Sequence, residues 1–220
     1  MWARPGQSAQ EMHLSKVYLV AGLLASALAL AGCNRNPLLV KRSQCPAVAV
    51  PAYAGSVTRF EPAQSRDADA IDLTAQLVDV SGQCIEGAEN ITSNLSFTVA
   101  AQRRQAGEAR EVYLPLFVAL VQGGNVLVSK QQTGVMLRFA EGQLRAEARG
   151  GARVDVQRSA ATLPADVQDK LSQKRRPNRR ESLVDPMADP QVRAAVRAAT
   201  FEALVGFQLD DPSLAYNVGK

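Results

Sequence analysis

The stretch LSFTVAA, residues 95–101, alternates between large apolar side chains and small or polar ones. The stretch IDLTAQL, residues 71–77, has the same period of two. Successive side chains of a strand point to opposite faces, so this alternation indicates strands with one buried face and one solvated face. Both stretches therefore predict half-buried strands of a mainly β protein.

Further strand-like segments are separated by turn residues at short spacing. The expected strands are Ser56–Phe60, Val112–Val121, Val126–Ser129, Gly134–Phe139 and Leu144–Ala148. Gly123-Gly124-Asn125 indicates a hairpin turn, and Pro115, which has no N–H, indicates that the early part of its strand lies at an edge or bulge. About seven short strands without intervening helices predict an antiparallel, immunoglobulin-like β-sandwich over residues 45–158.

Helix signals begin after Ser159. Thr162-Leu163-Pro164 opens a short helix that we expect to run through Leu171, because proline is tolerated in the first helical turn. Asp189 and Pro190 are the cap and first residue of a second, longer helix. Its apolar stripes are Val192, Val196, Ala199 and Ala203 on one side and Phe201, Leu204 and Val205 on another. We expect residues 159–220 to form a helical C-terminal section packed on the sandwich (α+β overall), with a candidate strand at Phe207–Leu209.

The N-terminal segment has the three-part pattern of a secretory signal. Arg4 and Lys16 precede an uncharged apolar run, residues 17–30, which ends in a small Ala-Gly pair. A membrane-spanning helix needs about 20 apolar residues, and this run is shorter and ends in a cleavage-type pattern. We therefore expect residues 1–32 to be removed on export, with Met12 as an alternative start.

At Leu30-Ala31-Gly32-Cys33 the sequence resembles the lipobox of bacterial lipoproteins: Leu, a small residue, Gly or Ala, then Cys. In that family the cysteine thiol receives a diacylglycerol, the signal is cut before it, and the new amino group is acylated, typically with palmitate. Two or three acyl chains hold a protein almost permanently, since each buried methylene contributes about 0.8 kcal/mol. The resemblance implies lipidation of Cys33 and a lipidated tether over residues 33–44.

Asn34 follows the lipobox cysteine. In Gram-negative members an Asp at this position favours the inner membrane, so the resemblance implies the outer membrane, facing the periplasm, with the inner membrane as the alternative. From Cys45 through the closing Phe207-Gln-Leu, the chain also resembles uncharacterised envelope lipoproteins of Gram-negative bacteria. That resemblance implies no particular activity.

Cys45 and Cys84 are the other two of the three cysteines. In an exported, oxidising setting an even pair is most simply a disulfide. A redox-active or metal-binding pair is the alternative, which the wide spacing and the absence of a CxxC motif disfavour. The sequence therefore predicts a structural disulfide.

The only histidine, His13, and the only tryptophan, Trp2, lie in the predicted signal. Without histidine, the mature chain cannot assemble a Ser-His-Asp or Cys-His site or the usual catalytic zinc site. No serine has the Ser-x-x-Lys spacing of penicillin-recognising enzymes. We therefore expect no enzyme activity, no cofactor and no metal.

Carboxylates offer the main alternative chemistry. They are Asp67, Asp69 and Asp72 before a predicted strand, and Asp210 and Asp211 beside a predicted turn. A carboxylate pair could act as acid and base on cell-wall glycan. Turns also select aspartate for local hydrogen bonds, and we favour that structural interpretation.

The densest charge run is basic. It consists of Lys170, Lys174, Arg175, Arg176, Arg179 and Arg180. Such a run is usually a solvated linker, and the alternative is an anionic-surface binder, with each cation adding about 1 kcal/mol near an anionic membrane. The formal net charge is only +4 and no aromatic residues interleave with the run, so we expect no nucleic acid partner.

These inferences converge on a membrane-anchored envelope lipoprotein. We expect it to act as a non-enzymatic binding or scaffolding element for an envelope protein partner. The sequence leaves the identity of the partner and the oligomeric state open.

Overall fold

The computed structural model describes residues 42–172 and 185–219. The chain forms two units, Met1–Arg42 and Ser43–Lys220, and the fold below is that of the second. The predicted signal, Cys33 and most of the predicted tether lie outside the described residues. None of the described helices is long and apolar enough to cross a membrane.

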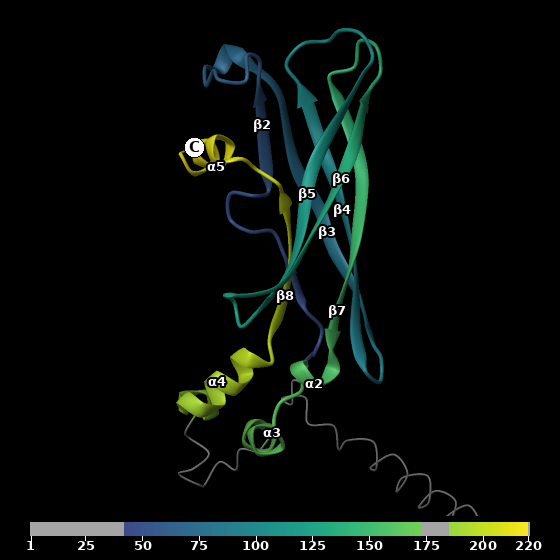
Figure 1. Ribbon diagram of the computed structural model, residues 1–220. Coiled ribbons are helices and arrows are strands. Elements are labelled where there is room, and N and C mark those ends of the chain that lie inside the picture. Colours follow the sequence, from purple (N-terminus) through teal and green to yellow (C-terminus); the bar gives the residue numbers. More distant parts are fainter. Residues whose placement is uncertain (1–41, 173–184, 220) are drawn as a thin grey trace, which may run out of the picture. The chain divides into compact units, whose positions relative to one another are not determined.

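Two four-stranded sheets make up most of this unit (Figure 1). The first sheet has the order β2-β3-β4-β7, and the second has the order β1-β8-β5-β6. The strands are β1 Ala47–Ala49, β2 Ser56–Phe60, β3 Ile71–Glu86, β4 Asn90–Arg103, β5 Arg110–Gln122, β6 Val126–Phe139, β7 Arg145–Gln157 and β8 Phe201–Phe207. The mainly β class predicted from the alternating stretches is confirmed.

Short helical segments occupy several of the connections. They are η1 Ala68–Ala70, α2 Arg158–Ala161, α3 Ala165–Ser172, η3 Pro186–Ala188, α4 Pro190–Ala198 and α5 Asp211–Val218. The predicted cap of α4 is confirmed, because the Asp189 carboxylate accepts a hydrogen bond from the backbone N–H of Gln191 at 2.9 Å. The short helix predicted around residues 162–171 is α3, which begins three residues later.

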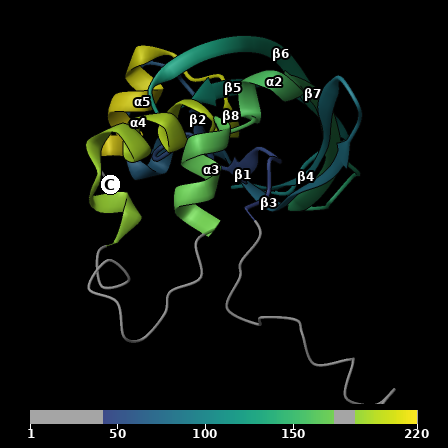
Figure 2. The same ribbon diagram turned by 90° about the horizontal axis from the view of Figure 1, so that it is seen from below.

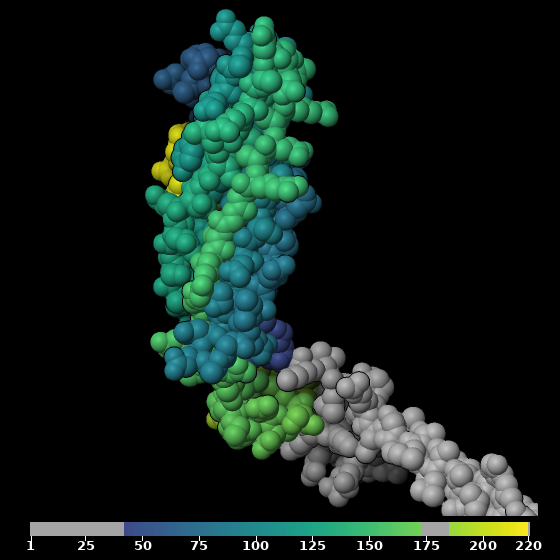
Figure 3. All heavy atoms as spheres, turned by 90° about the vertical axis from the view of Figure 1, so that its right-hand side faces the viewer, coloured from purple at the N-terminus to yellow at the C-terminus, as the bar shows by residue number. Residues whose placement is uncertain are grey.

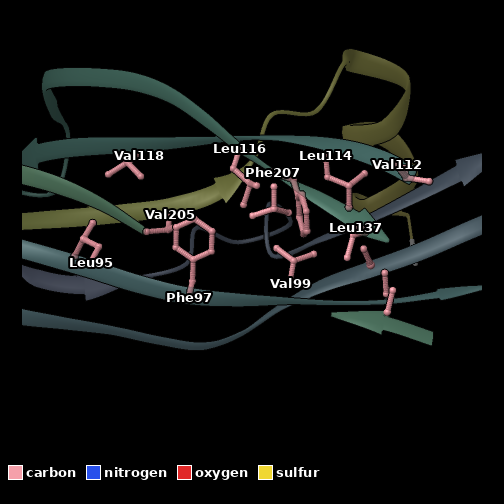
Figure 4. Packing of buried hydrophobic residues seen from close by; sticks show 14 of the residues in the cluster. Leu95, Phe97, Val99, Val112, Leu114, Leu116, Val118, Leu137, Val205 and Phe207 are labelled. Atoms are coloured by element: carbon pink, nitrogen blue, oxygen red, sulfur yellow. The ribbon is translucent and has the colours of Figure 1, made fainter. Parts of the chain in front are cut away.

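The two sheets enclose one main hydrophobic core. In β4, alternate residues of the LSFTVAA stretch are buried, as the sequence predicts. Figure 4 shows Phe97 and Val99 of β4 between the sheets, across from Leu114 and Leu116 of β5. Burial of each such side chain contributes roughly 1.5–3 kcal/mol, so this interface is the main source of stability.

The second sheet is strongly curved. Seen from below in Figure 2, β6 arches away from β5 toward β7, which lies at the edge of the first sheet. β6 and β7 lie side by side over part of their length. The curvature brings these two edge strands together along one side of the core.

The long second helix predicted from Asp189 is wrong beyond Ala198. α4 ends there, and Phe201–Phe207 forms β8, which lies between β1 and β5. Ala203, Val205 and Phe207 are buried at every second position, which is the period of a strand. The predicted strand at Phe207–Leu209 is the end of β8, which stops at Phe207. Residues 159–220 thus contribute a central strand as well as helices.

Two details of the predicted sheet also differ. The sheets are not wholly antiparallel, because β1 pairs with β8 in parallel. The predicted strands Val126–Ser129 and Gly134–Phe139 are parts of the single strand β6. The intervening residues 130–133 are polar, yet they continue the pairing with β5.

Candidate functional site

The first half of β6 forms an exposed strand edge. β6 lies at the end of its sheet and pairs with β5. Residues 126–132, called here the β6 edge, are exposed at every position and therefore on both faces of the strand. Val126, Leu127 and Val128 are 54%, 59% and 50% exposed. Edge strands are usually blunted by charge, proline or a cover, so three consecutive exposed apolar residues make this edge a candidate binding surface.

The hairpin that presents the β6 edge is held in place. Gly123 and Gly124 make the turn with φ angles of 64° and 82°, which glycine adopts without strain. The N–H of Gly123 donates to the carbonyl of Thr200 at 2.9 Å, and Nε2 of Gln122 donates to the carbonyl of Ala198 at 2.6 Å. The β6 edge is therefore fixed to the connection between α4 and β8.

Where β6 approaches β7, the described residues show side-chain bridging between the two edges. Strand pairing joins β6 to β5 and β7 to β4. Nε2 of Gln131 donates to the carbonyl of Arg153 in β7 at 2.8 Å. Figure 3 shows side chains of β6 and β7 filling this face. The backbone edge of β6 is thus covered by a side-chain contact near Gln131, while residues 126–128 stay open.

A second candidate surface lies where β8 ends. The pairing between β8 and β5 begins at Leu116, so the earlier residues of β5 pair with β6 on one side only. This confirms the edge position predicted for Pro115. Arg59 of β2 reaches across from the other sheet, and its Nη2 donates to the carbonyl of Tyr113 at 2.7 Å. A cleft lined by β2, β5, α5 and the chain after β8 opens beside it.

The candidate carboxylates before β3 are held by neighbouring side chains. Asp69 forms an ion pair with Arg104 at 2.6 Å. Asp72 accepts two hydrogen bonds from Arg110, both at 2.9 Å. Asp67 accepts a hydrogen bond from the hydroxyl of Ser65 at 3.2 Å. Asp67 thus makes a local hydrogen bond of the kind expected from the sequence, whereas Asp69 and Asp72 pair with arginines far along the chain.

The C-terminal carboxylates lie at the start of α5. The Asp210 carboxylate accepts a hydrogen bond from the backbone N–H of Ser213 at 2.9 Å, and this bond lowers the pKa of Asp210. Asp211 is the first residue of α5. The pair therefore begins a helix, and Asp210 is its cap.

Little of the predicted basic run is described. Lys170 lies in α3, and its Nζ is 3.3 Å from the Asp189 carboxylate. The other five residues, Lys174, Arg175, Arg176, Arg179 and Arg180, lie outside the described residues. The described member of the run is thus engaged in an ion pair at the cap of α4.

Cys45 and Cys84 form the predicted disulfide, with Cα atoms 6.0 Å apart. Cys45 precedes β1 of the second sheet, and Cys84 lies in β3 of the first. Both are half-buried against a small cluster around Ile91 and Phe201. The bond therefore links the two sheets near the point where the predicted tether enters the fold.

Within residues 42–172 and 185–219, no group of three or more His, Cys, Asp or Glu side chains is placed to hold a metal ion. No protein-family model, curated protein or solved structure matches the chain. The β6 edge and the cleft beside β5 are therefore the two candidate functional surfaces.

Sequence reasoning missed both surfaces. It identified residues 126–129 as part of a strand but not as an exposed edge, since nothing in the local pattern says that β6 ends a sheet. A usable signal was the run Val-Leu-Val followed by Ser-Lys-Gln-Gln, which lacks a period of two. Arg59 also gave a signal, because a charge interrupts the short predicted strand Ser56–Phe60.

Proposed function

We propose that this chain is a non-enzymatic envelope lipoprotein, anchored through lipidated Cys33, that binds an extended segment of a protein partner along the β6 edge. The anchor rests on the lipobox-like sequence and on the apolar run before it. The binding role rests on one observation, the three exposed apolar residues of an open strand edge.

The proposed mode of binding is strand addition. An exposed edge offers backbone N–H and C=O groups to an incoming strand, and the side chains around it select the partner. The pairing of β6 with β5 shifts register at Val128, and Val126, Leu127 and Val128 are all exposed, so a partner strand would contact apolar groups here. The fixed hairpin favours this mode because little ordering is needed on binding.

The finer fold description belongs to the same proposal. We infer that the two sheets form an immunoglobulin-like sandwich, a fold that presents binding edges and loops on a rigid core. Support comes from the two facing sheets, the shared core and the disulfide between them. The parallel pairing of β1 with β8 is a departure from the wholly antiparallel version.

The structural roles of the carboxylates support a non-enzymatic role over the glycan-cleaving alternative. Asp69 and Asp72 are paired with arginines, and Asp210 caps a helix. A wall-digestion assay with the full chain and its Asp69→Asn, Asp72→Asn and Asp210→Asn variants separates the two roles. Turnover by the wild type that any of these variants loses would favour the enzyme.

The binding proposal is tested by placing a photo-crosslinking residue at position 127 of the full chain in intact cells. The control position is Asn94, which is exposed on β4 of the other sheet. We expect a discrete cross-linked product at 127 that is absent at 94. Introducing Val126→Lys and Val128→Lys should abolish it, whereas Gln132→Lys, at the far end of the β6 edge, should reduce it less. A product unaffected by the valine substitutions, or no product at 127, contradicts the proposal.

A further inference from the structure

The cleft beside β5 exists because β8 pairs with only part of β5. β8 ends at Phe207, and the chain then leaves the sheet toward α5. The Pro115 carbonyl still accepts a hydrogen bond from the N–H of Gln208 at 3.0 Å, and residues 110–114 of β5 have one sheet neighbour, β6. Phe60 of β2 is covered by Tyr216 of α5, with ring centroids 5.0 Å apart, which closes the outer side of β2. The opening lies between the inner side of β2 and the unpaired part of β5.

Arg59 is the central cation of this cleft. It follows Val57 by two residues on β2 and so shares its face, which packs against the main core. Nη2 donates to Tyr113, and this is the one hydrogen bond of the guanidinium among the described residues. Burial lowers the pKa of Arg59 because desolvation disfavours the charged form. Arg59 lines the cleft, so its other N–H groups can donate to a ligand there.

The nearby charges leave Arg59 without a carboxylate partner in the described part of the chain. Asp72 is the carboxylate that acts on Arg59 through space, but it is bound by both nitrogens of the Arg110 fork. Arg66 donates to the carbonyls of Ala63 and Ser65 and lies over the Phe60 ring. Arg66 and Asp210 also line the cleft, and the charge of Arg66 helps to lower the pKa of Asp210 after its hydrogen bonds with Ser213. The formal charges of Arg59, Arg66 and Asp210 therefore sum to +1 in this cleft.

The walls of the cleft are largely apolar. They include Val57, Leu114, Pro115, Phe207 and Leu209. An apolar pocket with one oriented polar group is the usual form of a small-molecule site. A planar guanidinium fork matches the two oxygens of a carboxylate, and the net formal charge of +1 in the cleft suits one carboxylate better than a doubly charged phosphate.

We propose that this cleft binds a small apolar monocarboxylate, with the carboxylate on Arg59 and the hydrocarbon part against Pro115 and Leu209. The same chemistry is carried by a short fatty acid and by the apolar C-terminal residue of a peptide. The site is separate from the β6 edge, so failure of the proposed partner binding would not affect this proposal.

The test uses the full chain in lipid nanodiscs and ligand-detected NMR, with empty nanodiscs subtracted. One arm compares hexanoate with hexanamide, and the other compares N-acetyl-Gly-Leu with its C-terminal amide. We expect each acid to bind at least tenfold more tightly than its neutral amide. The acid that binds more tightly shows whether the ligand is a short fatty acid or the C-terminal residue of a peptide. Equal binding of acid and amide, tighter binding of hexyl phosphate, or no binding of either acid overturns the proposal.

Two variants locate the site. Arg59→Lys keeps the charge but loses the fork, and we expect it to weaken acid binding at least fivefold. Leu209→Glu places a negative charge on the wall and leaves the hydrogen bond from Arg59 to Tyr113 unchanged. We expect this variant to weaken acid binding at least tenfold. The control is Arg104→Met, which removes an exposed arginine paired with Asp69. Loss of binding in the control, or unchanged binding in both variants at an unchanged melting temperature, overturns the proposal.

Discussion

Cys45, on the approach to β1, is bonded to Cys84 in β3, with 39 residues of sequence separation between them. A covalent bond between sheets restricts the unfolded chain more than the folded one. In the chain-entropy model a loop of this length corresponds to about 4 kcal/mol. We predict that the Cys45→Ala/Cys84→Ala double variant loses about that much unfolding free energy, measured in urea. An unchanged denaturation midpoint would show that the bond adds nothing to stability.

Arg103 is a buried cation that organises two loops. It is 5% exposed, its guanidinium donates to the carbonyls of Gln143, Glu108, Gly107 and Ala140, and it lies over the Phe139 ring. Arg103→Met leaves several carbonyls without a donor. We predict a loss of roughly 2–4 kcal/mol in unfolding free energy.

The matched control is the neighbouring Arg104, whose ion pair with Asp69 is exposed. Arg104→Met should cost less than about 1 kcal/mol, because exposed ion pairs contribute little. Equal losses for the two variants would refute the role assigned to Arg103.

Asp210 makes stability depend on pH. Its pKa is lowered in the folded state, chiefly by its hydrogen bonds to Ser213. Such a group contributes stability above its unfolded pKa of about 3.9, and the contribution is lost as pH falls through the lower, folded pKa. Asp210→Asn keeps the capping oxygen but cannot titrate. We predict that this variant loses less stability than the wild type between about pH 5 and pH 2, measured by urea unfolding. An identical pH dependence in wild type and variant would exclude this contribution.

The anchor prediction concerns Cys33. Without the thiol no diacylglycerol can be attached, so Cys33→Ser should move the protein from the membrane fraction to the soluble fraction of fractionated cells. Cys84→Ala is the control, because it removes a disulfide-bonded cysteine that the anchor does not use and should leave the protein with the membrane. Persistence of the Cys33→Ser protein in the membrane fraction would contradict lipid anchoring.

The strands whose residues alternate between apolar and polar were predictable from the sequence. β4 and the first part of β3 have one face on the core and one in solvent, so burial imposes the period of two directly on residues 71–77 and 95–101. The disulfide was predictable for a different reason, since an even cysteine pair in an exported chain has one simple use.

β8 was not predictable by the same reasoning. It is a central strand, and only Glu202 among its seven residues is charged. Apolar residues at helical spacing continue from Val192 and Val196 of α4 to Ala199 and Ala203, so the local pattern favours one continuous helix. The strand forms because β1 and β5 both pair with it, a tertiary effect that overrides local preference.

The two candidate surfaces depend on where strands end, which local sequence does not encode. The β6 edge is open because the sheet order stops at β6, and the Arg59 cleft exists because β8 stops at Phe207. The carboxylates, in contrast, were candidate catalytic residues in the sequence, and the structure places them in a helix cap and in ion pairs.

The position of β8 also governs when the protein can assemble. Ribosomes deliver Phe201–Phe207 long after β1 and β5, between which it must be inserted. Until then β1 has no neighbour in its sheet, and one face of the core remains uncovered. Pairings between distant segments form slowly. A nascent chain of this kind stays incompletely folded throughout most of its synthesis, and truncation anywhere before residue 201 would leave a product unable to close its second sheet.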